Sequence, residues 1–256
     1  MEILKKLGAK KLLERFPNLE KYYLKYRKWE KRRRNHLRFR QDLKTYFEMN
    51  NNPNFILQKS DLYPRWEDYT EITTVGADYF YQETWAMGKI LEAHPSYHVD
   101  IGSRAIFVGL LSKAVHTTMV DIRPLPVQLD SLNFKKGSIL ILPFDDNSLE
   151  SVSSLCVIEH IGLGRYGDEL DYFGSEKAIA ELKRVIKPGG NLYISVPVEK
   201  ESRVYFNAHR VFSLEYLETL ITGFKLMERK FVYGDELKNE YEPYHFGTVL
   251  LHLVKK

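Results

Sequence analysis

The chain has 256 residues, 44% of them hydrophobic, and a formal net charge of +4, which is enough to bury the core of one domain and carry an appendage. Its single cysteine, Cys156, excludes an intrachain disulfide and a cysteine-based metal cluster, and we expect no metal site. No run of eighteen apolar residues and no apolar N-terminal segment is present, so the expectation is a cytoplasmic protein that neither spans a membrane nor carries a secretion signal.

The first 48 residues are strongly basic. They hold 16 Lys and Arg against 6 Asp and Glu, a balance of +10, whereas the rest of the chain has a balance of −6. The densest basic run covers residues 28–40. Leucine and aromatic residues recur at helical spacing in this part of the chain: Leu19, Tyr22, Tyr23, Tyr26 and Trp29. The spacing predicts a long amphipathic helix, broken near Pro17, in a basic N-terminal extension.

Three kinds of partner suit such a helix. The simplest is the acidic remainder of the chain or of a second subunit, which makes a homo-oligomer possible. The next is an anionic surface, so that residues 1–48 would hold the protein peripherally at a membrane or at a glycan-lipid. Nucleic acid is the least favoured of the three, although basic runs do bind it.

Residues 49–75, with Pro53 and Pro64, predict a linker on the surface. The expected domains are therefore a basic helical extension with its linker over residues 1–75 and a folded domain over residues 76–256. From Asp78 onward, apolar and aromatic residues predict a helix that leads into the first strand: Tyr79, Phe80, Trp85, Ile90 and Leu91.

Short apolar runs predict four strands in the first part of the folded domain. They cover residues 97–101, residues 117–120 with Asp121 at the end, residues 138–141, and the apolar part of residues 151–158, which includes Cys156. Residues 162–167 are rich in glycine and predict a loop. Ser175 is expected to cap the next helix, which has one apolar face formed by Ala178, Ile179, Leu182, Val185 and Ile186.

The remaining elements alternate between strand and helix. Residues 187–190 read KPGG and end the helix, because proline cannot continue it and glycine takes the left-handed turn. A strand follows at residues 192–196, and Ser213 caps a helix at residues 214–220. Residues 224–232 and 246–254 predict an antiparallel pair, whose connecting loop, 235–245, would close over a substrate. The expected core positions here are Met227, Val249, Leu251 and Leu253.

Three strings occur in order along the chain: LPFDDNSLESV at residues 142–152, VIEHI at 157–161 and ELKRVIKPGGNLYISVP at 181–197. Together they resemble the second half of the class I S-adenosylmethionine-dependent methyltransferase fold. Two further strings, IGLGRYGD at 161–168 and FNAHRVF at 206–212, resemble a little-characterised subfamily of that fold, a domain of unknown function. The resemblance covers residues 97–254. It implies an α/β fold with a Rossmann-like sheet, mostly parallel with a final antiparallel strand, to which this chain adds a basic helical N-terminal extension.

The resemblance implies S-adenosyl-L-methionine as the cofactor. Asp100, with the backbone of Gly102 and Ser103, would contact the methionine part of the cofactor, because a glycine turn lets a ligand approach the bare backbone. This chain departs from the Gly-x-Gly-x-Gly pattern, since Arg104 and Ile106 stand at the second and third glycine positions. The alternative is a plain strand-to-helix turn in a scaffold that has lost its cofactor.

Two more residues fall on the cofactor positions of the resemblance. Asp121 would accept hydrogen bonds from both ribose hydroxyls, although Arg123 could instead simply pair with it. Ser138 stands where relatives place an aspartate against the adenine amino group. A serine oxygen accepts one hydrogen bond there without charge assistance, which weakens binding by roughly 1 kcal/mol.

The acceptor would lie beside the loop that follows the fourth strand, because ligands of open α/β sheets bind at the carboxyl ends of the strands. His160 is a candidate general base, or the structural start of a helix. Arg165 and Tyr166 suit an anionic or sugar-like acceptor, by ion pairing and by stacking, or they only brace the loop.

Three polar residues are packed into the string FNAHR. Asn207 could orient a hydroxyl, His209 could serve as a base, and Arg210 could hold a carboxylate or phosphate. The alternative is a capping network in which Asn207 and His209 bond to the backbone.

The sequence therefore predicts a methyltransferase that uses S-adenosylmethionine, with O-methylation of a small-molecule or sugar/glycan acceptor as the expected reaction. The alternative is a non-catalytic, methyltransferase-like scaffold or binding protein. A nucleic-acid methyltransferase is a third hypothesis. Against it, the chain has no Asn-Pro-Pro-Tyr-type string after the fourth strand.

Overall fold

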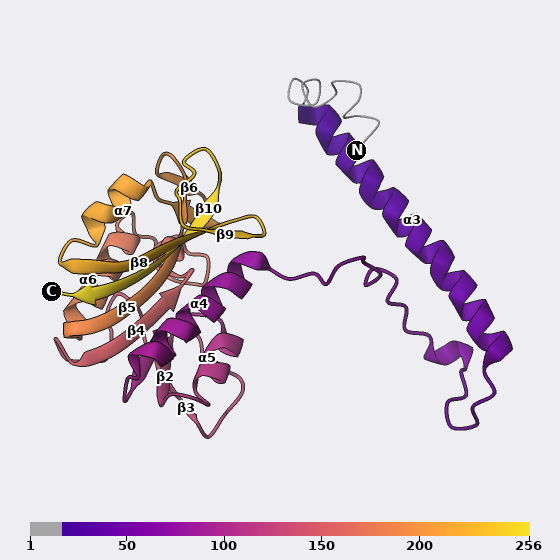
Figure 1. Ribbon diagram of the computed structural model, residues 1–256, viewed down its shortest axis with the longest axis horizontal. Coiled ribbons are helices and arrows are strands. Elements are labelled where there is room, and N and C mark those ends of the chain that lie inside the picture. The colour runs from indigo at the N-terminus through magenta and orange to yellow at the C-terminus, as the bar shows by residue number, and fades with distance from the viewer. Residues whose placement is uncertain (1–16) are drawn as a thin grey trace. The chain divides into compact units, whose positions relative to one another are not determined.

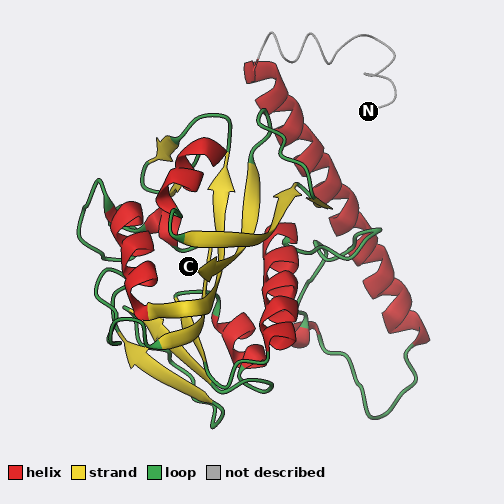
Figure 2. Ribbon diagram, turned by 60° about the vertical axis from the view of Figure 1, so that its left-hand side comes forward, coloured by secondary structure: helices red, strands yellow, loops and turns green. Residues whose placement is uncertain are grey.

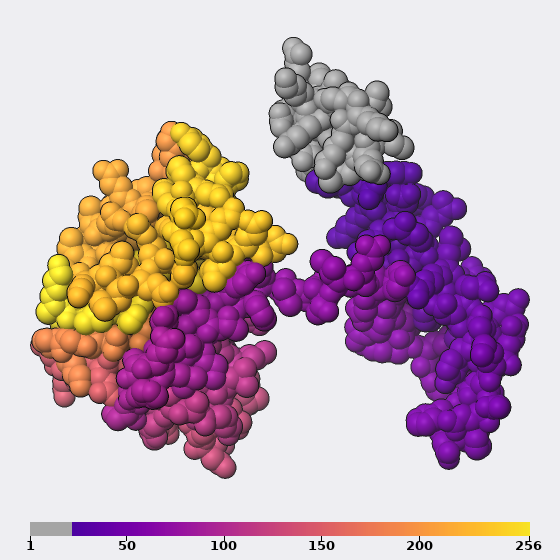
Figure 3. Space-filling view, in the orientation of Figure 1, coloured from indigo at the N-terminus to yellow at the C-terminus, as the bar shows by residue number. Residues whose placement is uncertain are grey.

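The computed structural model describes residues 17–256, so predictions that concern residues 1–16 lie outside the described residues. The chain divides into two compact units, Met1–Thr74 and Val75–Lys256 (Figure 1, Figure 3).

In the first unit, helix α3 (Pro17–Met49) runs without interruption for 33 residues. Pro17 is its first residue, where proline is tolerated because the amide at that position has no partner within the helix. From residue 22 onward, where the side chains are described, Asn35 is the one buried side chain of this helix. Most basic and aromatic side chains of this helix are therefore exposed within its own unit, among them Tyr22, Tyr26 and Trp29.

The segment expected to be a linker packs on α3. It holds one short 3-10 helix, η1 (Lys59–Asp61). The ring of Trp66 lies edge-on to His36 and Phe39, with ring centroids 4.9 and 5.6 Å away. The guanidinium of Arg38 lies 3.4 Å from the ring centroid of Tyr69. These contacts hold the end of the segment against the helix from which it departs.

The second unit is built on an eight-stranded sheet with the order β3-β2-β1-β4-β5-β10-β8-β9. Strands β3, β2, β1, β4 and β5 are parallel. Strand β10 runs antiparallel to both of its neighbours, β5 and β8, and β9 adds an antiparallel edge. The strand bounds are β1 (His98–Ile101), β2 (Thr117–Asp121), β3 (Leu132–Lys136), β4 (Leu149–Leu155), β5 (Ile186–Val198), β8 (Phe224–Tyr233), β9 (Glu236–Lys238) and β10 (Gly247–Lys255).

Helices cover both faces of the sheet (Figure 2). Helices α4 (Ala77–Ala93) and α5 (Ala105–Leu111) bury Ile90 and Phe107 on one face. Helices α6 (Gly174–Val185) and α7 (Leu214–Leu220) bury Leu182 and Leu217 on the other. Burial of such side chains contributes roughly 2 kcal/mol each. The predicted apolar face of α6 is confirmed, since Ala178, Ile179, Leu182, Val185 and Ile186 are all buried.

The prediction of a third strand at residues 138–141 is wrong. The third strand is β3, six residues earlier, and residues 138–141 form a tight turn in which the Ile141 amide donates to the Ser138 carbonyl at 3.0 Å. Strand β3 lies at the edge of the sheet and is only partly buried. Its sequence LNFKK therefore lacks the continuous apolar run of a central strand.

Several local predictions are also corrected. Ser175 lies inside α6 rather than at its cap, and its hydroxyl donates to the Ile158 carbonyl at 2.7 Å. Cys156 follows β4 instead of belonging to it. Met227 is 50% exposed and is not part of the core, whereas Val249, Leu251 and Leu253 are buried as expected. The predicted cap of α7 is confirmed, because the Ser213 hydroxyl accepts from the Tyr216 amide at 3.2 Å.

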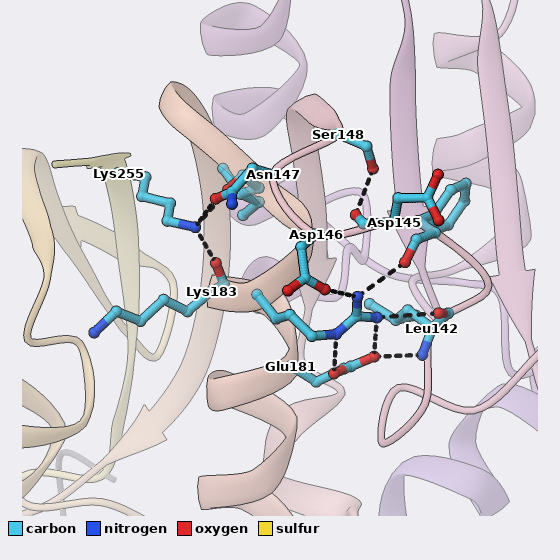
Figure 4. Close-up of polar contacts among 11 residues, drawn as sticks. Leu142, Asp145, Asp146, Asn147, Ser148, Glu181, Lys183 and Lys255 are labelled. Carbon is cyan, nitrogen blue, oxygen red and sulfur yellow. Dashed lines mark hydrogen bonds and ion pairs between the residues drawn. The ribbon is translucent and has the colours of Figure 1, made fainter.

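The string LPFDDNS forms a turn that α6 holds in place (Figure 4). Arg184 donates to the carbonyls of Leu142 and Phe144 at 3.3 and 3.0 Å and to Asp146 at 2.6 Å. Glu181 pairs with Arg184 and accepts from the Leu142 amide at 2.7 Å. The string that carries part of the family resemblance thus fixes the entry into β4.

Lys255, near the end of β10, closes the other side of this turn. Its ammonium donates to the Asn147 side chain and to the Lys183 carbonyl, both at 2.6 Å (Figure 4). Asn147 has φ +56°, a left-handed conformation that asparagine tolerates well.

Candidate functional site

The strand order reverses between β1 and β4, and ligands of open α/β sheets bind at the carboxyl edge at such a switch point. Two adjoining pockets lie there, and the first encloses ≈ 670 Å³ of space that is open to solvent. We call them together the carboxyl-edge cleft. Both pockets are lined by the same six residues: Gly102, Asp121, Arg123, Cys156, His160 and Tyr166.

The turn after β1 brings Gly102 to the cleft. Gly102 has φ +71°, and a Cβ at this position would lie 3.0 Å from the side chain of Val157, so only glycine fits without strain. The Ser103 hydroxyl accepts from the Leu155 amide at 3.0 Å, which ties the turn to the end of β4. The backbone of Gly102 and Ser103 therefore lies where the sequence predicted it.

Asp100 lies behind this turn and does not line the cleft. Its carboxylate is fully buried and accepts from the Ser103 amide at 3.0 Å and from the Ser153 hydroxyl at 2.5 Å. Burial raises the pKa of Asp100 to about 6. Because Asp100 is fully buried and lines neither pocket, a ligand in the cleft does not contact its carboxylate in this structure. Its role here is to hold the turn.

Asp121 ends β2 and faces both pockets. Its Oδ1 accepts from the Arg123 amide at 2.8 Å, and the Arg123 guanidinium approaches the two carboxylate oxygens at 3.3 and 3.4 Å. Asp121 therefore lies in the cleft, as expected for a cofactor ligand, and it also pairs with Arg123, as the alternative interpretation expected. Ser138 also lines the cleft, from the turn after β3, where its hydroxyl accepts from the Leu140 amide at 3.2 Å.

His160 ends a short 3-10 helix, η2 (Ile158–His160). Its Nδ1 lies 2.7 Å from the Ala208 carbonyl, which can only accept, so Nδ1 carries the proton. Nε2 then has a free lone pair and lies 3.6 Å from Glu159. Burial, followed by the charge of Arg165, lowers the pKa of His160 to about 4. His160 is therefore neutral at physiological pH.

Glu159 is a buried neighbour of His160 that lines neither pocket, and the sequence interpretation assigned it no role. It is only 2% exposed, and its Oε2 has no hydrogen-bond partner within residues 17–256. Burial raises the pKa of Glu159 to about 8. Burial and the Glu159 carboxyl also raise the pKa of the Cys156 thiol. The signal that could have revealed Glu159 is an acidic residue next to His160 within the string VIEHI, whose other three residues are apolar.

Tyr166 covers part of the cleft between two cations. The guanidinium carbons of Arg123 and Arg165 lie 4.4 and 5.1 Å from its ring centroid, and His160 meets the ring edge-on at 5.6 Å. Arg165 also donates to the Ala208 carbonyl at 2.7 Å. Arg165 and Tyr166 thus brace the loop and line the approach to the cleft at the same time.

The string FNAHR forms the turn and second strand of a hairpin, β6 (Arg203–Tyr205) and β7 (His209–Val211). Arg210 is buried and donates to the Ile161 carbonyl, to the Asp171 carbonyl at 2.8 Å and to Ser175 at 3.2 Å. Because these oxygens use its donors, Arg210 braces the loop from inside. This corrects the expectation that it holds an acceptor.

Asn207 and His209 differ from Arg210 in their surroundings. Asn207 lies exposed in the hairpin turn, and His209 lies beside Tyr205 and Phe246, with ring centroids 5.4 and 5.8 Å away. Burial, then the charge of Arg165, lowers the pKa of His209. Neither side chain forms a hydrogen bond to another described residue, so the capping alternative does not apply to them here.

Residues 17–256 contain no group of three His, Cys, Asp or Glu side chains arranged to hold a metal ion. No helix described here combines the length and apolar composition needed to cross a membrane.

Parts of the chain are similar in sequence to known proteins. A sequence family described as "Caenorhabditis protein of unknown function, DUF268" matches residues 126–242. An uncharacterized protein of Methanocaldococcus jannaschii is 28% identical over 187 residues, which is 68% of this chain and 77% of that protein.

Two solved structures are similar in fold. The N-methyltransferase NodS of Bradyrhizobium japonicum, in complex with S-adenosylhomocysteine, has a TM-score of 0.50 and 17% identity over 70% of this chain and 87% of its own. The 1,6-didemethyltoxoflavin-N1-methyltransferase of Burkholderia thailandensis, with bound 1,6-didemethyltoxoflavin and S-adenosylhomocysteine, has a TM-score of 0.50 and 18% identity over 68% and 78%.

The sheet order, the antiparallel β10 and the helices on both faces are those of the Rossmann-like fold of class I S-adenosylmethionine-dependent methyltransferases. The fold prediction is therefore confirmed. The more specific resemblance carried by IGLGRYGD and FNAHR stays a prediction.

Proposed function

We propose that the protein is an S-adenosylmethionine-dependent methyltransferase. One observation carries the proposal. The Asp121 carboxylate and the Gly102 turn face the same cleft at the switch point of the sheet. A carboxylate at the end of the second strand, beside a turn that only glycine can form, suits a nucleoside ligand with a vicinal diol.

The residues of the cleft fit this cofactor. The backbone of Gly102 and Ser103 would lie against its amino-acid end, Asp121 would accept from the ribose hydroxyls, and Ser138 would accept from the adenine amino group. Bound there, the cofactor would supply an electrophilic methyl group on a sulfonium. The chain would contribute alignment and exclusion of water, to which a base adds roughly 10²- to 10⁴-fold.

For the acceptor we keep the proposal of an oxygen on a small molecule or a sugar or glycan. Tyr166 provides an aromatic face between two guanidinium groups, an environment that suits a sugar ring with an anionic substituent. The free Nε2 of neutral His160 is positioned to receive a proton. Asn207 and His209, at the hairpin, remain candidates to face the same acceptor.

The test is calorimetric titration with S-adenosylmethionine and with S-adenosylhomocysteine. We expect wild-type protein to bind both in the micromolar range and Asp121→Ala to lose at least tenfold in affinity, because two charge-assisted hydrogen bonds are removed. Asp130→Ala, an exposed aspartate that lines neither pocket, is the matched control and should bind like wild type. No heat at millimolar ligand would favour the alternative, a scaffold that no longer binds the cofactor.

We further propose that helix α3 holds the protein at an anionic surface, with the catalytic unit in the cytoplasm. Support comes from Tyr22, Tyr26 and Trp29, which are 70%, 57% and 55% exposed, and from the Arg33 guanidinium 5.6 Å from the Trp29 ring centroid. Aromatic side chains beside arginines suit the headgroup region of a bilayer. Docking on a second subunit and contact with nucleic acid are the competing outcomes.

A further inference from the structure

We propose that Arg104 binds the carboxylate at the amino-acid end of the cofactor. This inference rests on the proposed function, and it assigns a role to the residue that breaks the expected glycine pattern. At the second glycine position the chain has an arginine, whose guanidinium binds the cofactor carboxylate instead of leaving this contact to backbone amides.

Arg104 follows Ser103 in the turn after β1 and immediately precedes α5. It lines the same pocket as Gly102, Ser103 and Asp121, the residues assigned to the amino-acid end and the ribose of the cofactor. Its backbone has φ −64° and ψ 132°, an ordinary extended conformation, so a side chain at this position costs no strain.

The guanidinium is restrained by α4. Its central carbon lies 4.4 Å from the ring centroid of Tyr79, and one of its nitrogens lies 3.4 Å from Glu83. Tyr79 lines the same pocket, so the stacked guanidinium lies at the wall of the cleft. A cation whose position is already restrained loses little freedom when it binds an anion, which favours binding.

The donors of this guanidinium are unused. No N–H group of the Arg104 side chain donates a hydrogen bond to a described residue, and the approach to Glu83 is an ion pair without hydrogen-bond geometry. The side chain of Arg104 is 46% exposed, so a ligand can reach it. A guanidinium with its fork of donors free suits a carboxylate, which can accept two parallel hydrogen bonds.

The other guanidinium groups near the cleft are already engaged. Arg123 donates hydrogen bonds to both carboxylate oxygens of Asp121. Arg165 donates to the Ala208 carbonyl, and Arg210 donates to backbone carbonyls in the interior. Asp100, the side chain expected at this end of the cofactor, lies behind the turn. Arg104 is thus the cation best placed for the carboxylate.

The test compares two nucleosides by calorimetric titration. S-Adenosylhomocysteine carries the amino-acid end, whereas 5′-methylthioadenosine keeps the adenine and ribose but lacks it. Arg104→Gly restores the residue of the typical glycine turn. We expect it to weaken S-adenosylhomocysteine binding about 10- to 100-fold, the effect of losing a charge-assisted hydrogen-bond pair. Binding of 5′-methylthioadenosine should stay within about twofold of wild type.

Two further variants sharpen the test. Ile106→Ala changes the other replaced glycine position, where the side chain is 65% exposed, and should leave both affinities unchanged. Arg104→Lys keeps the charge without the planar fork and should fall between wild type and Arg104→Gly. Thermal unfolding of each variant checks that the fold is retained.

The failures are distinguishable. If wild type binds S-adenosylhomocysteine and Arg104→Gly binds it equally well or more tightly, the inference is overturned while the proposed function stands. The same holds if Arg104→Gly weakens both nucleosides alike, since the contact would then not be with the amino-acid end. If wild type binds neither nucleoside, the proposed function fails and the inference fails with it.

Discussion

Burial sets the protonation states of the two polar side chains that end helix η2. Glu159 has its pKa raised to about 8, and His160 has its pKa lowered to about 4. At neutral pH both residues are therefore largely uncharged, and Glu159 keeps one oxygen without a partner within residues 17–256. A neutral acid beside a neutral imidazole can donate and accept hydrogen bonds without the cost of a buried charge.

This arrangement predicts a pH-dependent stability. Folded Glu159 keeps its proton up to about pH 8, whereas in the unfolded chain it loses the proton near its ordinary value of 4.5. Between these values folded Glu159 binds more protons than unfolded Glu159, so its contribution to stability falls as pH rises from about 4.5 to 8 and then levels off. Glu159→Gln cannot ionise, so its stability relative to wild type should rise by roughly 4 kcal/mol between pH 4.5 and pH 8.5.

Chemical denaturation at the two pH values measures this difference. Cys156 and Tyr79, which interact with Glu159, have raised pKa values and so stay protonated over this range. His160, whose Nε2 lies 3.6 Å from Glu159, is present in both proteins, so its own titration contributes to both. Glu169→Gln, an exposed glutamate of the nearby loop, is the matched control and should show no such trend. An advantage of Glu159→Gln that is the same at both pH values would contradict the burial argument.

Among the elements, the hairpin β6–β7 packs against the glycine-rich loop, whose Tyr166 lines the cleft. The Ala208 carbonyl receives hydrogen bonds from His160 and Arg165, at the turn of the hairpin. Arg210 of β7 reaches the loop and α6 from behind. Residues 162–167 are rich in glycine, and these contacts hold the segments on either side of them in place.

Loss of the Arg210 side chain should destabilise the α/β unit. Arg210→Gln is expected to lower the free energy of unfolding by about 2–4 kcal/mol, because it leaves buried carbonyls without donors. Arg203 lies on the other strand of the same hairpin, where it is exposed and pairs with Glu201. Arg203→Gln is the matched control and should change the free energy of unfolding by less than about 0.5 kcal/mol. Equal effects of the two substitutions in a urea titration would show that the buried contacts of Arg210 do not stabilise the unit.

At the scale of the whole molecule, the chain joins a basic helical unit to an α/β unit that holds the cleft. The charge imbalance of the sequence follows this division, with the excess of Lys and Arg in the first 48 residues. The domain boundary expected at residue 75 stays a prediction, as does the role of α3.

The surface proposal for α3 predicts binding to vesicles. The intact protein should sediment with vesicles of an anionic phospholipid and not with vesicles of a neutral one. The triple variant Arg33→Gln, Arg34→Gln and Arg40→Gln should reduce the partition coefficient by about 100-fold, since each cation near an anionic surface contributes about 1 kcal/mol. Calorimetric titration with S-adenosylhomocysteine should remain unchanged in the same variant. Equal sedimentation with neutral vesicles, or full binding by the triple variant, would rule out the anionic surface.

Local sequence determined the elements whose signal is contained in a few neighbouring residues. Strands β1, β2, β4 and β5 are buried on both faces and appear as short apolar runs, and α6 shows its apolar face at helical spacing. Ser213 caps α7 because a serine oxygen meets an amide three residues on, a purely local contact. The ordered strings of the second half indicated the fold, and Gly102, Asp121, Ser138, His160 and Tyr166 all lie in the cleft.

Tertiary structure decided what depends on contacts between distant segments. Strand β3 was not predicted, because it lies at the edge of the sheet and its sequence, LNFKK, has no continuous apolar run. Asp100 and Arg210 are ordinary polar residues in sequence, and only the packing around them turns their donors and acceptors inward, away from the cleft. Arg104 and Tyr79 come together across 25 residues of chain, and Glu159 owes its protonation state to burial. Burial and long-range pairing set these properties, and no local pattern of residues records them.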